Sequence, residues 1–185
     1  MSKKTPLCDF GWNAPRFKLH STTNDSVDYN ELLIKPDCTG ILVMFICNHC
    51  PYVKAIISKL VKDCKVLKKL GVYSVAICSN DFLDYPEDSF EEMKRYSEKN
   101  NFSFPYLHDP DQNIARLYGA ICTPDFFGFN KEGELQYRGR LDASGKEENN
   151  TLDRDLLNAM IQISRTGKGP KKQLASIGCS IKWKK

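Results

Sequence analysis

Two apolar runs in the first half of the chain predict a pair of buried strands. Residues 41–46 are all apolar and are bounded by Gly40 and Cys47, and residues 72–78 form a second, largely apolar run. Strands lose the alternation with polar residues when both of their faces are covered. Between the runs, apolar residues recur at steps of three and four, which predicts an amphipathic helix that Gly71 ends. This stripe comprises Val53, Ile56, Ile57, Leu60, Val61, Cys64, Leu67 and Leu70.

A strand, a helix and a strand within so few residues imply parallel strands joined by a right-handed crossover, so we expect an α/β protein. Thr151 is expected to cap the last helix, with Asp153 and Asp155 in its first turn. Beyond Gly167 we expect irregular structure. The other expected elements are helices over residues 29–34, 86–99 and 113–118 and strands over residues 104–107, 126–130 and 135–141.

The composition indicates one soluble domain. Of the 185 residues, 41% are hydrophobic and 27% charged, and no apolar run approaches the ~20 residues that span a bilayer. The first residues lack the apolar stretch of a secretory signal, so we expect a cytoplasmic protein without membrane attachment. In that reducing compartment most of the 8 cysteines should stay free thiols, and only a special pair should cycle.

Positive charge is concentrated at the C-terminus. The formal net charge is +4, and residues 165–185 hold seven basic residues and no acidic one. Such a tail can bind nucleic acid or an anionic surface, but a solvated or docked tail is the simpler explanation. We therefore expect no nucleic-acid partner, a domain over residues 1–166, and a basic tail over residues 167–185 that docks on it.

Cys47 and Cys50 lie between the end of the first predicted buried strand and the start of the amphipathic helix. The free N–H groups and the dipole of a first helical turn stabilise a thiolate, so Cys47 should ionise more readily than an ordinary cysteine. Cys50 in the first turn is close enough to resolve a mixed disulfide on Cys47. Pro51 suits the first turn, and His49 can place positive charge near the thiolate. We predict that Cys47 is the nucleophile and Cys50 the resolving cysteine.

The spacing of this pair also occurs in zinc sites, where two cysteines supply half of the ligands. The sequence has no second pair of cysteines at this spacing and no pair of histidines at finger spacing. A redox pair is therefore the better interpretation, and no metal or other cofactor is predicted.

The segment from Cys47 to Pro51 resembles the active-site motif of the thioredoxin superfamily. Residues 117–124, with the phenylalanines that follow, resemble the thioredoxin segment whose cis-proline faces the active disulfide. The resemblance implies a thioredoxin-like fold with a central mixed sheet flanked by helices, and it makes Pro124 the cis-proline. It also implies that Thr123 offers its backbone to an extended substrate, with Asn48 and Pro51 at the same substrate-binding surface.

Three further segments extend the resemblance. Residues 11–19 resemble the N-terminal segment of the redoxin group, which includes the peroxiredoxins. Residues 137–142 and 176–184 are similar to bacterial thioredoxin-like proteins of the alkyl hydroperoxide reductase (AhpC/TSA) type. The resemblance implies an N-terminal redoxin extension and a C-terminal tail around the thioredoxin-like core, and it supplies no substrate.

The chain departs from thioredoxins at Ile41. Thioredoxins carry a buried Asp at this position, six residues before the first cysteine, where it helps to move the proton of the second thiol. A different proton acceptor is needed here, and His49 and Glu31 are the candidates, although Glu31 also suits the solvated face of a short helix.

A peroxiredoxin-like arrangement is the second interpretation of the same residues. Peroxiredoxins place one peroxidatic cysteine three residues after Thr or Ser, together with a distant Arg. Cys50 followed by Pro51 fits that cysteine, whereas Cys47 replaces the Thr. Arg138 and Arg140 are candidates for the distant Arg, but alternating charge on a hairpin explains both more simply.

The remaining cysteines divide by context. Cys64 in the helix stripe and Cys78 at a strand end are expected to be inert and buried, and Cys8 and Cys38 lie in loops without an activating neighbour. Cys122 lies near the predicted cis-proline and either packs or intercepts a mixed disulfide. Cys179, in an apolar part of the tail, is either incidental to a docked tail or a second resolving thiol.

Our leading hypothesis is a thiol–disulfide oxidoreductase whose Cys47/Cys50 pair rests reduced in the cell. Its partners would be protein or small-molecule disulfides and thiols and an upstream thiol reductant. The alternatives are a thiol peroxidase that uses Cys50, with antioxidant activity, and a copper-binding module built on the cysteines and His49. The sequence names no physiological substrate or electron donor and makes no prediction of oligomeric state.

Overall fold

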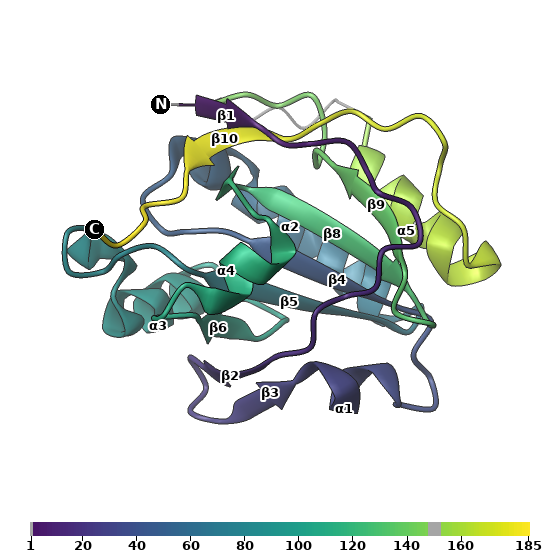
Figure 1. Ribbon diagram of the computed structural model, residues 1–185, viewed down its shortest axis with the longest axis horizontal. Coiled ribbons are helices and arrows are strands. Elements are labelled where there is room, and N and C mark those ends of the chain that lie inside the picture. The colour runs from purple at the N-terminus through teal and green to yellow at the C-terminus, as the bar shows by residue number, and fades with distance from the viewer. Residues whose placement is uncertain (1, 148–152) are drawn as a thin grey trace.

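A mixed sheet runs through the centre of the computed structural model, which describes residues 2–147 and 153–185 (Figure 1). In these ranges the sheet has seven strands in the order β3-β2-β6-β5-β4-β8-β9. The pairs β4–β5 and β5–β6 are parallel, and the other neighbours are antiparallel. The α/β class with a mixed central sheet is therefore confirmed. The strands are β2 (Lys18–Ser21), β3 (Ser26–Asp28), β4 (Gly40–Phe45), β5 (Val72–Cys78), β6 (Tyr106–His108), β8 (Asp125–Asn130) and β9 (Leu135–Gly139).

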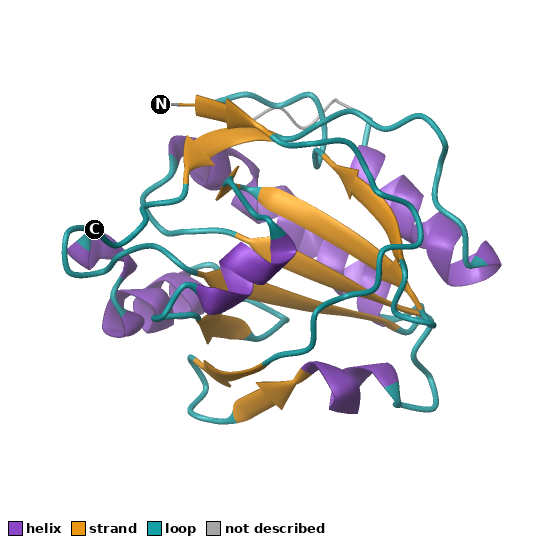
Figure 2. Cartoon of the chain, in the orientation of Figure 1, coloured by secondary structure: helices purple, strands orange, loops and turns teal. Residues whose placement is uncertain are grey.

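Helices cover both faces of this sheet, as Figure 2 shows. Residues of α2, α3 and α5 join the hydrophobic cluster on one face, and residues of α1 and α4 join the cluster on the other. Side chains of β4 alternate between the clusters: Leu42 and Met44 lie on the α2 side, and Ile41 and Val43 on the α4 side. This explains the uninterrupted apolar run. The helices are α1 (Tyr29–Leu33), α2 (Pro51–Lys68), α3 (Phe90–Lys99), α4 (Asn113–Tyr118) and α5 (Asp155–Thr166).

Most predicted elements are present, with shifted ends. The helix expected over residues 86–99 is divided into a short 3-10 helix, η1 (Pro86–Asp88), and α3, because Ser89 between them is extended with φ −61° and ψ 157°. The strands expected over residues 104–107 and 135–141 are displaced or shortened by up to two residues. The predicted cap at Thr151 lies outside the described residues. Asp155 lies in the first turn of α5, whereas Asp153 precedes the helix.

A smaller sheet brings the first and last strands of the chain together. In the described ranges it has three strands in the order β1-β10-β7, and Figure 1 shows β1 and β10 side by side. The expectation of irregular structure beyond Gly167 is thus wrong for β10, because its partners lie far away in the sequence, where local patterns carry no information. These strands are β1 (Ser2–Lys4), β7 (Cys122–Thr123) and β10 (Ile177–Ser180).

No helix within the described ranges combines the length and the apolar character that crossing a membrane requires.

Candidate active site

The predicted cysteine pair lies at the junction between β4 and α2. Cys47 follows the end of β4, and Cys50 is extended and directly precedes Pro51, the first residue of α2. Both are buried, with 1% of Cys47 and 0% of Cys50 exposed. The structure shows the reduced pair, because both cysteines are free thiols.

Pro124 lies between β7 and β8, next to Thr123, which contacts the cysteine pair. The Thr123–Pro124 peptide bond is cis, as the resemblance implied. Cys47 Sγ lies 3.2 Å from Thr123 Oγ1, and the Cys50 thiol donates to the Thr123 carbonyl oxygen over 3.1 Å. The structure therefore brings the two cysteines, Thr123 and Pro124 together at one place.

The backbone edge of Thr123 is already occupied. β10 pairs antiparallel with β7, so that Cys179 lies opposite Thr123 and Ser180 opposite Cys122. We expected this edge to be open to an extended substrate. That expectation is wrong for the conformation seen here, because the tail of the chain itself fills the edge.

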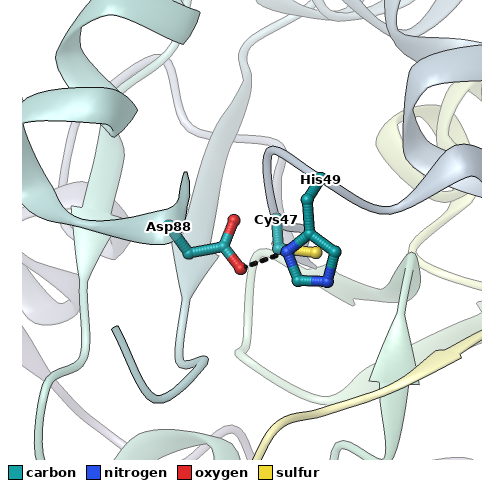
Figure 3. Close-up of side chains that lie close together, drawn as sticks. All are labelled: Cys47, His49 and Asp88. Atoms are coloured by element: carbon teal, nitrogen blue, oxygen red, sulfur yellow. Dashed lines mark hydrogen bonds and ion pairs between the residues drawn. The ribbon is translucent and has the colours of Figure 1, made fainter. Parts of the chain in front are cut away.

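A buried carboxylate that the sequence analysis missed lies beside the pair. Asp88 is 0% exposed, and its Oδ2 lies 2.7 Å from His49 Nδ1 (Figure 3). Asp88 also accepts hydrogen bonds from the Asn48 N–H at 2.8 Å and from Asn80 Nδ2 at 2.7 Å. The hydrogen bond to Asp88 raises the pKa of His49. Burial alone would raise the pKa of Asp88, but the hydrogen bonds from His49 and Asn80 outweigh it and lower the pKa.

The loop between the cysteines is held from several sides. The Asn48 side chain donates to the Glu87 carbonyl at 2.8 Å and accepts from the Tyr106 hydroxyl at 3.0 Å. The His49 ring stacks on Tyr85, with 5.6 Å between the ring centroids. Asn48, predicted to contact substrate, is thus a buried support of this loop, whereas Pro51 is exposed.

The two thiols of the pair share a hydrogen bond, and their pKa values move in opposite directions. Hydrogen bonds from Cys47 and from the side chain and N–H of Cys179 outweigh burial and lower the pKa of Cys50. The hydrogen bond to Cys50, burial and the charge of Asp88 raise the pKa of Cys47. We expected Cys47 to be the more acidic thiol. In the structure the pKa of Cys50 is instead the lower of the two, because Cys47 and Cys179 both hydrogen-bond to its sulfur atom.

Four of the other thiols differ from Cys50 in that burial raises their pKa, and Cys122 shares this property. Cys64 and Cys78 are buried, and burial raises the pKa of each to about 12, so they have the inert surroundings that we expected. Burial likewise raises the pKa of the half-buried Cys8 to about 11 and the pKa of Cys38. Cys122 is fully buried, burial raises its pKa, and it donates to the Pro124 carbonyl at 3.6 Å.

The two arginines proposed for a peroxide site each bind a carboxylate. Arg138 is only 9% exposed and binds Asp125 at 3.0 Å, and Arg140 binds Asp155 at 2.7 Å. Solvated alternating charge is therefore the wrong explanation for Arg138, because its carboxylate partner comes from the adjacent strand β8. Ile41 is completely buried in the cluster on the α4 side, and Glu31 is exposed on α1.

Three groups at the junction have the chemistry of metal ligands. One ligand atom each of Cys47, His49 and Asp88 lie within 4.8 Å of one another. A thiolate, an imidazole and a carboxylate together suit a divalent transition metal. The hypothesis of metal binding named both cysteines and His49, whereas the structure brings Asp88 into this group and directs Cys50 toward Thr123 and Cys179.

A mixed sheet that carries a cysteine pair at a strand–helix junction, facing a cis-proline, defines the fold as thioredoxin-like. Residues 10–138 match the AhpC/TSA family, and the chain belongs to that family. The thioredoxin domain of a thiol-disulfide oxidoreductase from Bacteroides vulgatus has the same fold, with a TM-score of 0.64, 16% identity, and coverage of 84% of this chain and 97% of that chain.

Two more similar structures cover the whole of this chain. An uncharacterized conserved protein from Geobacillus kaustophilus is 39% identical, with a TM-score of 0.90 and 97% of its own chain covered. A hypothetical protein from Sinorhizobium meliloti is 33% identical, with a TM-score of 0.90 and 99% of its own chain covered. No curated protein matches the chain.

Proposed function

We propose that the protein is a thiol–disulfide oxidoreductase that uses Cys47 and Cys50, with thiols and disulfides as substrates in the reducing cytoplasm. The observation that carries this proposal is the contact of both sulfur atoms with Thr123, directly before the cis-proline. Membership of the AhpC/TSA family supports thiol-based redox chemistry, and structures of thiol–disulfide oxidoreductases share the fold.

The hydrogen bond between the cysteines suggests how the proton moves. Cys47 attacks a substrate disulfide, and its proton passes to the Cys50 thiolate as the first substrate thiolate leaves. Cys50 then donates to the Thr123 carbonyl, 3.1 Å away, until it attacks Cys47 and releases the second substrate thiol. The products are a Cys47–Cys50 disulfide, one thiol and one thiolate, so the two electrons lost by the pair reduce the substrate.

The test compares the reduced wild-type protein with Cys47→Ser and Cys64→Ser in the reduction of a small aromatic disulfide, followed by the absorbance of the released thiolate. Wild type and Cys64→Ser should each release two thiol equivalents per protein. Cys47→Ser should release thiol at least about a hundredfold more slowly than the wild type, because the attacking sulfur atom is absent. Release by Cys47→Ser at the wild-type rate would refute the assignment of the nucleophile.

A thiol peroxidase is the second candidate, because the lowered pKa of Cys50 gives a thiolate directly before Pro51. It predicts rapid peroxide consumption that persists in Cys47→Ser. Stopped-flow mixing of Cys47→Ser with hydrogen peroxide separates the two functions, since a protein that relies on Cys47 should not consume peroxide rapidly in that variant.

The cluster of Cys47, His49 and Asp88 supports metal binding as a third candidate. Elemental analysis of protein purified without chelator tests it, with Asp88→Asn as the control for this set of ligands. One equivalent of copper or zinc in the wild type and none in the variant would favour this function over exchange.

A further inference from the structure

The tail strand is built against the cis-proline segment rather than resting loosely on it. A Cβ on Gly178 would lie 2.1 Å from the Thr123 carbonyl oxygen, so only glycine permits this approach. Ser176 Oγ donates to the Pro124 carbonyl at 2.8 Å, and the Ser176 N–H donates to Thr5 Oγ1 at 3.0 Å. The strand is therefore fixed on both of its edges at the point where Cys179 faces the site.

Contacts on the far side of Cys179 fix the strand as well. Ile181 N–H donates to the Ile121 carbonyl at 3.1 Å. The Gln112 side chain donates to the Lys182 carbonyl at 2.7 Å and accepts from the Lys184 N–H at 2.8 Å. A cysteine between two anchored segments has a defined position, which an incidental cysteine on a solvated tail would not have.

Cys179 packs against the hydrophobic cluster that contains Cys47 and Cys50. It lies opposite Thr123 in the strand register, and the Cys50 thiol is 3.1 Å from the carbonyl of the same Thr123. The side chain and the N–H of Cys179 lie close enough to Cys50 to contribute to the lowered pKa of its thiol. Cys179 is half-buried, whereas Cys47 and Cys50 are at most 1% exposed, so it is the member of the three that reaches solvent.

We infer that Cys179 is a third redox cysteine, which exchanges with Cys50 and connects the buried pair to external thiols and disulfides. This inference rests on the proposed function. In the step, the Cys179 sulfur attacks Cys50 of the Cys47–Cys50 disulfide, the Cys47–Cys50 bond breaks, and a Cys50–Cys179 bond forms. The proton of Cys179 passes to the departing Cys47. One disulfide replaces another, so no oxidant or reductant is consumed.

This exchange returns Cys47 to its thiol form while the oxidising equivalent moves to a half-exposed position. A partner thiol can then reduce the Cys50–Cys179 disulfide by attacking Cys179. Cys122, one residue from Thr123, is the natural control, because its thiol is buried and bonded to the Pro124 carbonyl rather than to the pair.

The first experiment oxidises Cys47→Ser with oxidised glutathione and maps disulfides in a tryptic digest without reduction. Cleavage places Cys50 in the peptide of residues 19–54 and Cys179 in the peptide of residues 173–182, so their linkage gives one crosslinked product. Fragmentation distinguishes Cys50 from Cys38 in the longer peptide. We expect most of the protein to carry the Cys50–Cys179 linkage, and we expect the same when Cys122→Ala is added.

A second variant tests the geometry while keeping all the thiols of the tail. Gly178→Val in the Cys47→Ser background should push β10 from Thr123 and lower the yield of the linkage at least fivefold. Unchanged yield would overturn the inference, as would Cys50 found only as a glutathione adduct with Cys179 free.

Disulfide mapping of the oxidised wild type distinguishes the proposed function of the Cys47/Cys50 pair from the role of Cys179. After oxidation, a Cys47–Cys50 disulfide together with a fraction of Cys50–Cys179 supports both. A Cys47–Cys50 disulfide with Cys179 free under every redox buffer overturns the role of Cys179 and leaves the proposed function intact. Absence of both linkages overturns the two together.

Discussion

The β4–α2 junction and the core beneath α2 each hold buried thiols, but Cys50 at the junction differs from the core thiols in the direction of its pKa shift. Cys64 and Cys78 in the core are 2% and 0% exposed, and burial raises the pKa of each to about 12. Cys50 at the junction is 0% exposed, yet its pKa is lowered. The difference lies in hydrogen bonds, since Cys47 and Cys179 both bond to Cys50. In this protein the partners of a sulfur atom, and not its exposure, distinguish a thiol whose pKa is lowered from buried thiols whose pKa is raised.

The largest expected effect comes from removing a cysteine in each region. Cys50→Ser should slow complete disulfide reduction on the order of a thousandfold, because the mixed disulfide on Cys47 can no longer be resolved internally. Cys64→Ala should leave the rate within about twofold and lower the free energy of unfolding by about 1 kcal/mol. Rates and urea unfolding curves measure the two effects. Comparable losses of rate in both variants would remove the distinction between the regions.

The acidity of the junction can be titrated directly. The ultraviolet absorbance of the thiolate should persist in the reduced wild type well below the ordinary thiol pKa of 9.0 and should vanish in this range in Cys50→Ala. Cys78→Ala should leave the titration unchanged. Cys179→Ala should move it to higher pH, because one hydrogen bond to Cys50 is lost. A titration that is insensitive to Cys50→Ala would contradict the lowered pKa of Cys50.

An effect of intermediate size is expected from a comparison of two buried carboxylates, Asp88 and Asp109. Asp88 lies beside Cys47 and raises its pKa, whereas Asp109 bonds to Ser79 and to the first turn of α4, outside the junction. Asp88→Asn should lower the pKa of Cys47 and raise the rate of attack near neutral pH by up to about tenfold. Asp109→Asn should lower stability and leave this rate unchanged. Single-turnover kinetics against pH distinguish the two carboxylates.

The smallest expected effect is a difference in pH dependence between two histidines. The hydrogen bond to Asp88 raises the pKa of His49, so the stability that it contributes is complete below the unfolded value of 6.5 and is lost as pH rises through the folded pKa. Burial lowers the pKa of His108, so this residue costs stability as pH falls through 6.5. His49→Asn should therefore destabilise more at about pH 5 than at about pH 9, on the order of 1 kcal/mol.

His108→Asn should show the opposite trend, with its relative stability greatest in acid. Urea unfolding of the wild type and both variants at the two pH values gives the comparison. Parallel curves for the two variants would show that Asp88 does not set the charge of His49.

The sequence was most informative where structure is local. The apolar run of β4, the stripe of α2 and the position of Gly71, which has φ 78°, all follow from neighbours within a few residues. The cis bond at Pro124 came from a resemblance over a short segment. Such features place Cys47 and Cys50 at the junction before any tertiary contact is known.

The features that the sequence left out depend on contacts between distant segments. The sequence analysis gave Asp88 no role at the site, and its bond to His49 spans 39 residues of sequence. Arg138 binds Asp125 on the adjacent strand, and β10 pairs with β7, which lies more than fifty residues earlier in the sequence. The acidity of Cys50 could not be predicted without β10, because Cys179 supplies part of its hydrogen bonding.

The pairing of β1 with β10 joins Ser2 to Cys179 and so closes almost the entire chain into one loop. The entropic cost of closing a loop grows with its length, so this contact depends on a folded core. It should open before the central sheet does. We expect the amide hydrogens of β10 to exchange with solvent water faster than those of β4. The rate of that opening would then limit how often a bulky partner reaches Cys50, and hydrogen-exchange measurements would report the speed of access as well as the local stability.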